Sequence, residues 1–372
     1  MSYGSIDGHR SMALDRVRNR AYAEALSRVI TPDSVVLDLG AGVGIHGLIA
    51  ARLGARRVYL VEPEDVISVA DEAARANNLQ EVVRCLHGRL EDVTIPERVD
   101  VIISVFTGNM LLNEDLLPVL LRARDTYLKP GGILLPDRAT IELAPVTAPA
   151  LHAREIESWS EPQHEVTLAP ARAYAANTVF YGWDRADVSY LAEPNSLHAV
   201  DLATDAYDAL HSETAFTIRT AGVCHGLAGW FTMRLGDRWV STAPVAERMH
   251  WSPAFLPLDP PIPLAEGDTL SVRIDRAPYG DWTWRVASPH GSQRHSTLLS
   301  APLKASTLRK AALDYTPVPN EEGQAVQFIL AQCTGATRVS EMAAQVRSRW
   351  PARYPTDDDA TRFVQRIVKA FT

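Results

Sequence analysis

The chain has 372 residues, of which 46% are hydrophobic and 22% charged, a balance that excludes disordered, collagen-like and coiled-coil proteins. A formal net charge of −8 argues against a general nucleic-acid-binding protein, and the length predicts two or three domains. The three cysteines, Cys85, Cys224 and Cys333, are too widely spaced for a metal motif or a disulfide framework. Because no apolar run reaches about 18 residues and no signal-peptide pattern is present, we expect a cytoplasmic protein without a membrane span.

The first third of the chain alternates between strand and helix patterns. Apolar runs predict buried strands at 35–39, 57–61, 82–86, 99–105 and 133–135. Amphipathic runs predict helices at 7–29, 45–53, 66–76 and 113–127, and the first of these ends before Pro32. Strands that alternate with helices form βαβ units, so we expect a Rossmann-like α/β domain with a parallel sheet over residues 1–137.

The pattern changes after Asp137. Residues 138–307 contain short segments of alternating polarity that are rich in Thr, Val, Trp and Tyr, which predicts an antiparallel β-domain, either a barrel or a sandwich. Within it, an alanine-rich patch predicts a helical piece near residues 165–185. After Pro317 and Pro319, helical patterns at 321–333, 339–350 and 357–371 predict a third, small helical domain over residues 308–372.

A glycine-rich turn, Gly40-Ala-Gly42-Val-Gly44, lies between the first predicted strand and its helix. Such a turn lets the backbone approach a ligand closely, and Glu62 at the end of the next strand is placed to hold two ribose hydroxyls. These features fit a nicotinamide dinucleotide as well as S-adenosyl-L-methionine. However, the Gly-x-Gly-x-Gly spacing with Asp38 before it resembles the first motif of S-adenosylmethionine-dependent methyltransferases. Leu128–Pro136 is similar to a late strand of that fold, so we expect S-adenosyl-L-methionine as the cofactor.

Four further stretches narrow the resemblance to the protein arginine methyltransferases. They are His9–Tyr22, His87–Asp92, Ser104–Glu114, and a loop that contains Ser241–Pro244 and Met249–Trp251. The similarity spans about residues 3–285, roughly three quarters of the chain. It implies an S-adenosylmethionine-binding domain followed by a β-barrel with a dimerisation arm. A homodimer is therefore expected.

The resemblance also implies roles for individual residues. Arg18 would bind the methionyl carboxylate as a charge-assisted pair, and Met12 would lie near the reactive methyl group. Asp15 would hydrogen-bond His250 across the two domains. For the adenine ring, Glu91 would accept from the amino group, and the backbone near Leu90 would contact the ring. Independently of the resemblance, Met12, Asp15, Arg18 and Tyr22 are spaced to share one face of a helix.

The sequence departs from the family at the methyl-acceptor site. The family surrounds a guanidinium group with two glutamates, and these positions are occupied here by Val105 and Glu114. Asp115 is a poor substitute for the missing carboxylate, because adjacent helical residues point apart. Loss of one carboxylate weakens a buried cation site strongly. We expect the pocket to be lined by Tyr3, Val105, Phe106, Asn109 and Trp251.

Three functions remain open. The sequence favours N-methylation of a non-guanidinium side-chain nitrogen, such as an imidazole, indole or amine, in an amino acid or peptide of natural-product biosynthesis. Glu114 would then be the base or orienting group, and the Asp15–His250 pair would relay the proton. The first alternative is methylation of an arginine guanidinium, with a second carboxylate supplied from elsewhere. The second alternative is an inactive S-adenosylmethionine-binding partner protein.

The last segment lies outside the arginine methyltransferase resemblance. Residues 328–343 suggest a helix, a tight turn and a second helix, which weakly resembles winged-helix modules that bind leader peptides. A packing or oligomerisation element is the simpler interpretation. A DNA-binding helix-turn-helix is the least favoured, because the chain is acidic overall.

Overall fold

The computed structural model describes residues 5–105 and 107–372. Two of the predicted pocket residues, Tyr3 and Phe106, therefore lie outside the described residues. The chain divides into two compact units, Met1–Pro302 and Leu303–Thr372, and each is described by itself. In the part of the chain that the structure describes, no helix is both long enough and apolar enough to cross a membrane. The cytoplasmic location stays a prediction.

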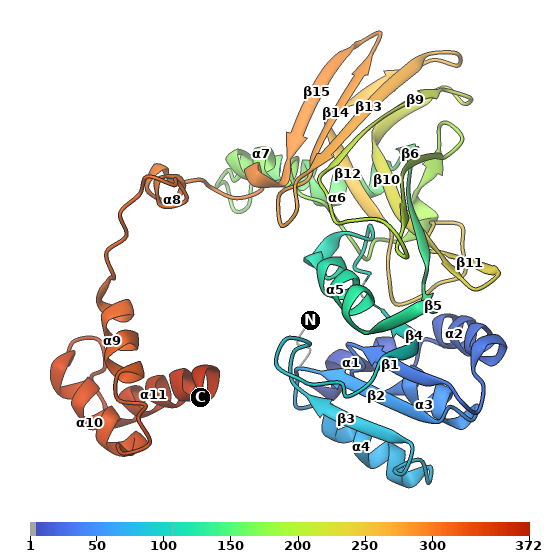
Figure 1. Cartoon of the computed structure of the whole chain (residues 1–372). Helices are drawn as coiled ribbons and strands as arrows, with labels where there is room; N and C mark the ends of the chain where they lie inside the picture. The colour runs from blue at the N-terminus through green and yellow to red at the C-terminus, as the bar shows by residue number, and fades with distance from the viewer. Residues whose placement is uncertain (1–4, 106) are drawn as a thin grey trace. The chain divides into compact units, whose positions relative to one another are not determined.

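The first half of the first unit contains a five-stranded parallel sheet in the order β3-β2-β1-β4-β5 (Figure 1). Its strands are β1 (Val35–Leu39), β2 (Arg57–Glu62), β3 (Val83–His87), β4 (Val99–Ser104) and β5 (Leu128–Leu135). The helices of this half are α1 (Ile6–Ala13), α2 (Arg16–Val29), α3 (Ile45–Arg52), α4 (Ile67–Ala76) and α5 (Leu117–Tyr127). Every residue of β1 is buried, as expected for a strand covered on both faces. Since β1 and β4 are neighbours, the loops that follow them meet at one edge of the sheet.

The N-terminal helix is interrupted, so the predicted continuous helix at 7–29 is wrong. Leu14 and Asp15 separate α1 from α2, and Asp15 has an extended backbone with φ of −69° and ψ of 94°. The Asp15 carboxylate accepts a hydrogen bond from the backbone N–H of Arg18 at 3.0 Å and thereby caps α2. Aspartate is a favoured N-cap because it pairs with an otherwise unsatisfied N–H group. The single helical face predicted from Met12 to Tyr22 therefore does not exist.

The second half of this unit is an antiparallel, barrel-like β-domain, as predicted. One sheet has the order β11-β10-β6-β7, with β12 beside β10 and β8 beside β6, and the other has the order β15-β14-β13-β9. The strands of the first sheet are β6 (Arg138–Thr147), β7 (Ser189–Tyr190), β8 (Asn195–Asp201), β10 (Gly222–Leu235), β11 (Arg238–Ser241) and β12 (Ala254–Leu264). Those of the second are β9 (Leu210–Thr217), β13 (Thr269–Arg276), β14 (Thr283–Ser288) and β15 (Gly291–Ser296).

An excursion between β6 and β7 is partly helical, and two of its short helical elements, Ala169–Ala171 and Arg172–Ala175, lie within the predicted range of 165–185. It contains α6 (Pro149–Glu155), two 3₁₀ turns (Glu157–Ser160 and Ala169–Ala171) and α7 (Arg172–Ala175). The Arg172 guanidinium donates hydrogen bonds of 2.8 and 2.7 Å to the two carboxylate oxygens of Asp259 on β12. This bidentate pair fixes the excursion, which we call the arm (residues 149–175), to the β-domain.

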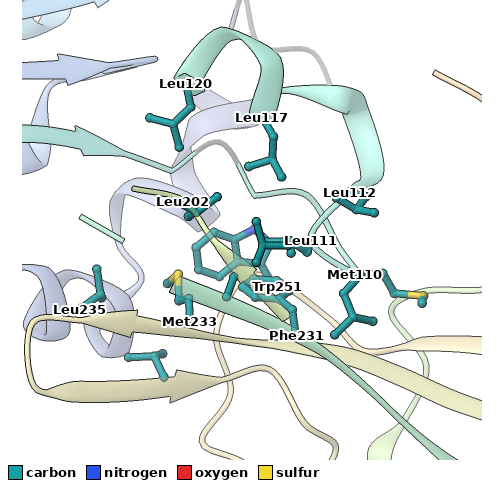
Figure 2. Close-up of a cluster of buried hydrophobic side chains, with 14 of the residues drawn as sticks. Met110, Leu111, Leu112, Leu117, Leu120, Leu202, Phe231, Met233, Leu235 and Trp251 are labelled. Atoms are coloured by element: carbon teal, nitrogen blue, oxygen red, sulfur yellow. The ribbon is translucent and has the colours of Figure 1, made fainter. Parts of the chain in front are cut away.

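An apolar cluster joins the two halves of the first unit. Figure 2 shows Leu117 and Leu120 of α5 on one side and Phe231 and Met233 of β10 on the other, with Trp251 between them. Residues 110–112, in the loop after β4, belong to the same buried cluster. This loop is therefore packed against the β-domain, and that contact matters for the site described below.

The second unit is a helical domain with its own core. After the short α8 (Ala305–Lys310), it consists of α9 (Glu321–Leu330), α10 (Val339–Arg349) and α11 (Asp357–Phe371). Ile329, Val346 and Val364, one from each of these three helices, are fully buried in the core. The three predicted helices are confirmed. No strand occurs in residues 303–372, all of which are described, so the winged-helix interpretation is wrong: a wing is a β-hairpin.

Candidate cofactor and acceptor site

A cavity of about 280 Å³ opens where β1 and β4 end. The loops after β1, β2 and β4, helices α1 and α2, and the segment 250–251 of the β-domain all contribute to its wall. The cavity gathers most of the predicted site residues: Met12, Arg18, Asp38, Gly40, Gly42, Glu62, Val105, Asn109, Glu114, His250 and Trp251. Residues far apart in the sequence thus form one site.

The glycine turn forms a narrow backbone cradle. Gly40, Gly42 and Gly44 have φ of 70°, 55° and 80°, a left-handed conformation that glycine adopts without steric cost. The Glu62 carboxylate accepts hydrogen bonds from the backbone N–H of Gly42 at 2.9 Å and of Glu64 at 3.0 Å. Because each carboxylate oxygen accepts more than one bond, Glu62 retains the capacity to accept from the hydroxyls of a ribose.

Asp38 ties the sheet to the helix behind the glycine turn. Its carboxylate accepts a hydrogen bond of 2.7 Å from the backbone N–H of Gly47 on α3. Burial raises the pKa of Asp38 to about 7, and the negative charge of Glu62 adds to the effect, although the Gly47 bond and Arg18 oppose it. Asp38 is therefore a buried carboxyl group that stabilises the turn and lines the cavity.

Arg18 is a buried cation without a carboxylate partner. Only 3% of its surface is exposed, and no Asp or Glu of the described chain forms an ion pair with it. One terminal nitrogen donates to the backbone oxygen of Met12, and the guanidinium lies 5.7 Å from the ring centroid of Trp251. Its Nε is buried, and no group in residues 5–105 and 107–372 accepts a hydrogen bond from it. Such a donor needs an acceptor, and the methionyl carboxylate of S-adenosylmethionine fits this requirement.

The hydrogen bond expected between Asp15 and His250 is present. The carboxylate of Asp15 lies 2.9 Å from Nδ1 of His250 and 2.8 Å from its backbone nitrogen. Burial lowers the pKa of His250 despite the nearby carboxylate, so the imidazole is neutral at pH 7. Burial alone would raise the pKa of Asp15, but hydrogen bonds from His250 and Arg18 outweigh it and lower that pKa. The pair combines an ionised carboxylate with a neutral imidazole.

The loop after β4 forms the side of the cavity where the sequence predicts the methyl acceptor. Val105 presents an apolar, half-buried side chain, and Thr107 is buried with a hydroxyl that has no hydrogen-bond partner among the described residues. Asn109 accepts a hydrogen bond of 3.1 Å from the backbone N–H of Ser252. Glu114 supplies a carboxylate, and its backbone has a left-handed φ of 75°. This side of the cavity therefore combines one carboxylate, one hydroxyl and one amide.

Several predicted site residues lie elsewhere. Neither Glu91 nor Leu90 lines the cavity. Glu91 is exposed and forms an ion pair of 2.6 Å with Arg122, and Leu90 is buried. Their adenine-binding roles stay predictions. Gly44 also lies outside the wall. It packs against α4 instead, since a Cβ there would lie 2.8 Å from the side chain of Ala70. Asp15 does not line the cavity either; its hydrogen-bond partner His250 does.

The structure also reveals wall residues that the sequence reasoning missed. His9 packs on the glycine turn, since a Cβ on Gly42 would lie 2.9 Å from its Nδ1. His46 is buried, stacks on Tyr22 with 4.3 Å between ring centroids, and bonds Asn19 at 3.1 Å. Its position in the first turn after Gly44 was a usable signal, because that turn borders the cavity.

Two known families match the chain. Residues 36–132 match the methyltransferase domain family, and residues 137–285 match the family described as the arginine methyltransferase oligomerization subdomain. The chain is 32% identical over 287 residues to the probable histone-arginine methyltransferase CARMER of Drosophila melanogaster and to the corresponding protein of Drosophila persimilis. That alignment covers 73% of this chain and 54% of each relative. The chain thus spans about half the length of the curated relatives it matches.

Solved structures share the fold of the first unit. The Trypanosoma brucei PRMT1 enzyme–prozyme heterotetrameric complex with AdoHcy gives a TM-score of 0.72 at 24% identity, over 80% of this chain and 99% of the other. The Arabidopsis thaliana protein arginine methyltransferase 10 gives a TM-score of 0.70 at 23% identity, over 79% of this chain and 99% of the other. At these identities the likeness concerns the fold alone.

Proposed function

Because the chain is a protein arginine methyltransferase-like, S-adenosylmethionine-dependent methyltransferase, we propose that it methylates a guanidino nitrogen of arginine in a peptide or protein. The observation that carries this proposal is that Arg18, Glu114 and His250 line one cavity. A cation for the cofactor carboxylate, a carboxylate for the acceptor and a neutral base are thereby brought together. This choice reverses the order of the alternatives that the sequence favoured, because the relatives are histone-arginine methyltransferases.

The residues of the cavity divide between cofactor and acceptor. Arg18 holds the methionyl carboxylate through its unpaired Nε, and Glu62 holds the ribose hydroxyls. Bound S-adenosylmethionine supplies a methyl group on a sulfonium, which is electrophilic. The protein therefore has to orient the acceptor and remove its proton, and proximity provides most of the rate enhancement.

Glu114 and His250 serve the acceptor. The Glu114 carboxylate accepts N–H groups of the guanidinium and turns a nitrogen lone pair toward the methyl group. His250 donates its Nδ1–H to Asp15, which leaves Nε2 as the basic nitrogen. Because its pKa is lowered by burial, the ring is neutral and can accept the proton released after transfer.

A second candidate is N-methylation of a non-guanidinium nitrogen, such as an imidazole, indole or amine. Val105 favours it, because an apolar side chain stands where a second carboxylate would neutralise the cation. A guanidinium presents five N–H donors, and one carboxylate pairs with two of them in a bidentate contact. A less charged ring needs fewer acceptors.

A panel of acceptors tests the proposal. Purified protein is incubated with labelled S-adenosylmethionine and matched peptides that contain arginine, histidine, tryptophan or lysine at one position. We expect label in the arginine peptide, and a large loss of rate in the Glu114→Gln variant. Preferential labelling of another peptide supports the second candidate. If S-adenosylhomocysteine binds but no peptide is labelled, the inactive-partner alternative replaces the proposal.

The arm supports a homodimer. Trp159, Val166, Leu168 and Tyr174 of the arm are exposed to solvent, and the matched family is described as an oligomerization subdomain. Exposed apolar side chains that gather on one excursion are typical of an interface. Sedimentation velocity should show a dimer, and the double substitution Val166→Asp with Leu168→Asp should shift it toward monomer. A monomeric wild-type protein would contradict the homodimer.

A further inference from the structure

The loop that carries Glu114 has an unusual backbone. Met110, Leu111, Glu114 and Asp115 all have a positive φ, between 51° and 75°, and none of them is glycine. Left-handed residues other than glycine persist only where their surroundings over-determine the backbone. The contacts that hold this loop therefore also determine where Glu114 lies.

Asp115 is held from the β-domain by Arg276, the last residue of β13. The two terminal nitrogens of Arg276 donate hydrogen bonds of 2.8 and 2.7 Å to the two carboxylate oxygens of Asp115. Tyr207 donates its hydroxyl to the same carboxylate, and the backbone N–H of Tyr279 donates to it at 3.0 Å. Arg276 is only 6% exposed. Asp115 is thus fully engaged outside the cavity wall and is unavailable as a second acceptor carboxylate.

Asn113, on the other side of Glu114, is held in the same way. Its amide donates to the Tyr181 hydroxyl at 2.5 Å and accepts from the indole N–H of Trp282 at 3.0 Å. The Arg276 guanidinium lies 5.3 Å from the ring centroid of Trp282, which links the two attachments. Both chain neighbours of Glu114 are therefore fastened to the β-domain, while Glu114 lines the cavity.

The beginning of the loop is fixed by packing. Met110, Leu111 and Leu112 are almost fully buried and belong to the apolar cluster of Figure 2, in which Leu111 lies beside Trp251. The polar network around residues 113 and 115 also fixes the orientation of the loop, because bidentate pairing determines the orientation of both partners. A buried ion pair adds little net stability, so its main effect here is geometric.

We propose that Arg276 is a positioning residue that, through Asp115, sets the direction of the Glu114 carboxylate toward the methyl acceptor. This inference rests on the proposed function of Glu114. It makes β13 a part of the acceptor site although it contributes no residue to the cavity wall. It also explains why a chain with two adjacent acidic residues presents a single carboxylate to the acceptor.

The first test compares Arg276→Lys with Arg273→Lys. Lysine keeps the charge but loses the bidentate fork. Arg273 is a matched control, because it lies on the same strand and pairs with Glu213 and Asp275. For Arg276→Lys we expect kcat/KM for the acceptor to fall at least about tenfold, since small misplacements cost up to about a hundredfold. Affinity for S-adenosylhomocysteine and the melting temperature should stay close to those of Arg273→Lys. Equal kcat/KM in both variants would overturn the proposal.

The second test asks whether Arg276 acts through Glu114. In the Glu114→Gln background, Arg276→Lys should cause little further loss of kcat/KM, because the group that it positions is already disabled. Fully additive losses would show that Arg276 acts independently and would refute the positioning role. Asp115→Asn should reproduce the effect of Arg276→Lys, and this gives a second variant if the lysine protein folds poorly.

Hydrogen exchange provides a measurement that needs no activity. In Arg276→Lys, amides of residues 108–116 should exchange faster than in Arg273→Lys, while those of β1 and β2 remain unchanged. Unchanged exchange at 108–116 would overturn the proposal even if no acceptor is ever found. A different result is that the wild-type protein methylates no peptide while exchange is faster in Arg276→Lys. That result would refute the proposed function but would still support the role of Arg276 in holding the loop through Asp115.

Discussion

The charged side chains of the cavity differ in how their charge is compensated. Asp15 is ionised and paired with His250, whereas Arg18 forms no ion pair with any carboxylate of the described residues, and burial raises the pKa of Asp38. Burial disfavours the Arg18 cation, and the charges of Asp15 and Asp38 oppose this effect without a direct ion pair, so an anionic ligand in contact with Arg18 would stabilise it further. These differences are the physical basis for assigning the cofactor carboxylate to Arg18.

Replacement of Arg18 by glutamine should weaken the cofactor interaction selectively. Loss of the cation leaves the methionyl carboxylate buried and unpaired, which costs about 2–5 kcal/mol and lowers S-adenosylhomocysteine affinity at least about thirtyfold. The exposed Arg16, on the same helix, gives the control variant Arg16→Gln, which should bind as the wild type does. Calorimetric titration of both variants measures the difference. Equal affinities would remove Arg18 from the cofactor site.

Asp38 should make the stability of the unliganded protein depend on pH. Its folded-state pKa of about 7 lies above the ordinary value of 3.8, so the folded state holds a proton that the unfolded state releases. The free energy of unfolding should therefore decrease as the pH rises from about 4 to about 7. This group contributes up to about 1.4 kcal/mol per pH unit to that decrease. Asp38→Asn should remove that slope in chemical unfolding measured at pH 5 and pH 7. An identical slope in both proteins would contradict the raised pKa.

At the scale of elements, the interruption between α1 and α2 and the turn after β1 shape the half of the cavity that we propose for the cofactor. The strand, the glycine turn and Glu62 could be predicted, because they depend on local sequence and on the order of strands. The helix break could not be predicted, because the amphipathic pattern of residues 7–29 continues on both sides of Leu14 and Asp15. Asp15 serves two structures at once, as the cap of α2 and as the partner of His250.

Asparagine and alanine at position 15 should separate these two roles. Asparagine caps helices about as well as aspartate, so Asp15→Asn should keep the free energy of unfolding close to that of the wild type. Asp15→Ala loses the cap as well and should be less stable by about 1–2 kcal/mol. Both variants lose the ionised partner of His250, so both should lose methyl-transfer activity. Full activity in Asp15→Asn would show that the charge of Asp15 has no part in proton transfer.

Contacts between distant elements mark the limit of sequence reasoning. Glu91 and Arg122 are 31 positions apart, and Asp115 and Arg276 are 161 positions apart. No local pattern predicts either pair, yet the first places Glu91 outside the cavity wall and the second holds the Glu114 loop. The sequence does not single out Thr107, because the lack of a hydrogen-bond partner for its hydroxyl among the described residues depends on how the loop folds.

At the scale of the whole molecule, the chain combines a methyltransferase unit with a helical unit. The cavity, the arm and the Arg276 network all belong to Met1–Pro302, and the second unit has a separate core. The matches to known families end at residue 285 and do not reach the helical unit.

Removal of residues 303–372 should leave the first unit intact. Because the core of the helical unit is formed by its own helices, the truncated protein should keep its affinity for S-adenosylhomocysteine within about twofold. Its thermal transition should also match that of the same unit in the full chain. Calorimetry of both proteins provides the comparison. Loss of S-adenosylhomocysteine binding after truncation would show that the second unit is required for the site.

The most direct test of the account is to locate the transferred methyl group. The full-length protein is incubated with S-adenosylmethionine and a peptide that contains one arginine, one histidine and one lysine, and the product is sequenced by fragmentation mass spectrometry. We predict a single added methyl group on the guanidino nitrogen of the arginine, and its loss in the Glu114→Gln variant. A methyl group on the imidazole or the amine, or an undiminished product in Glu114→Gln, would contradict the account.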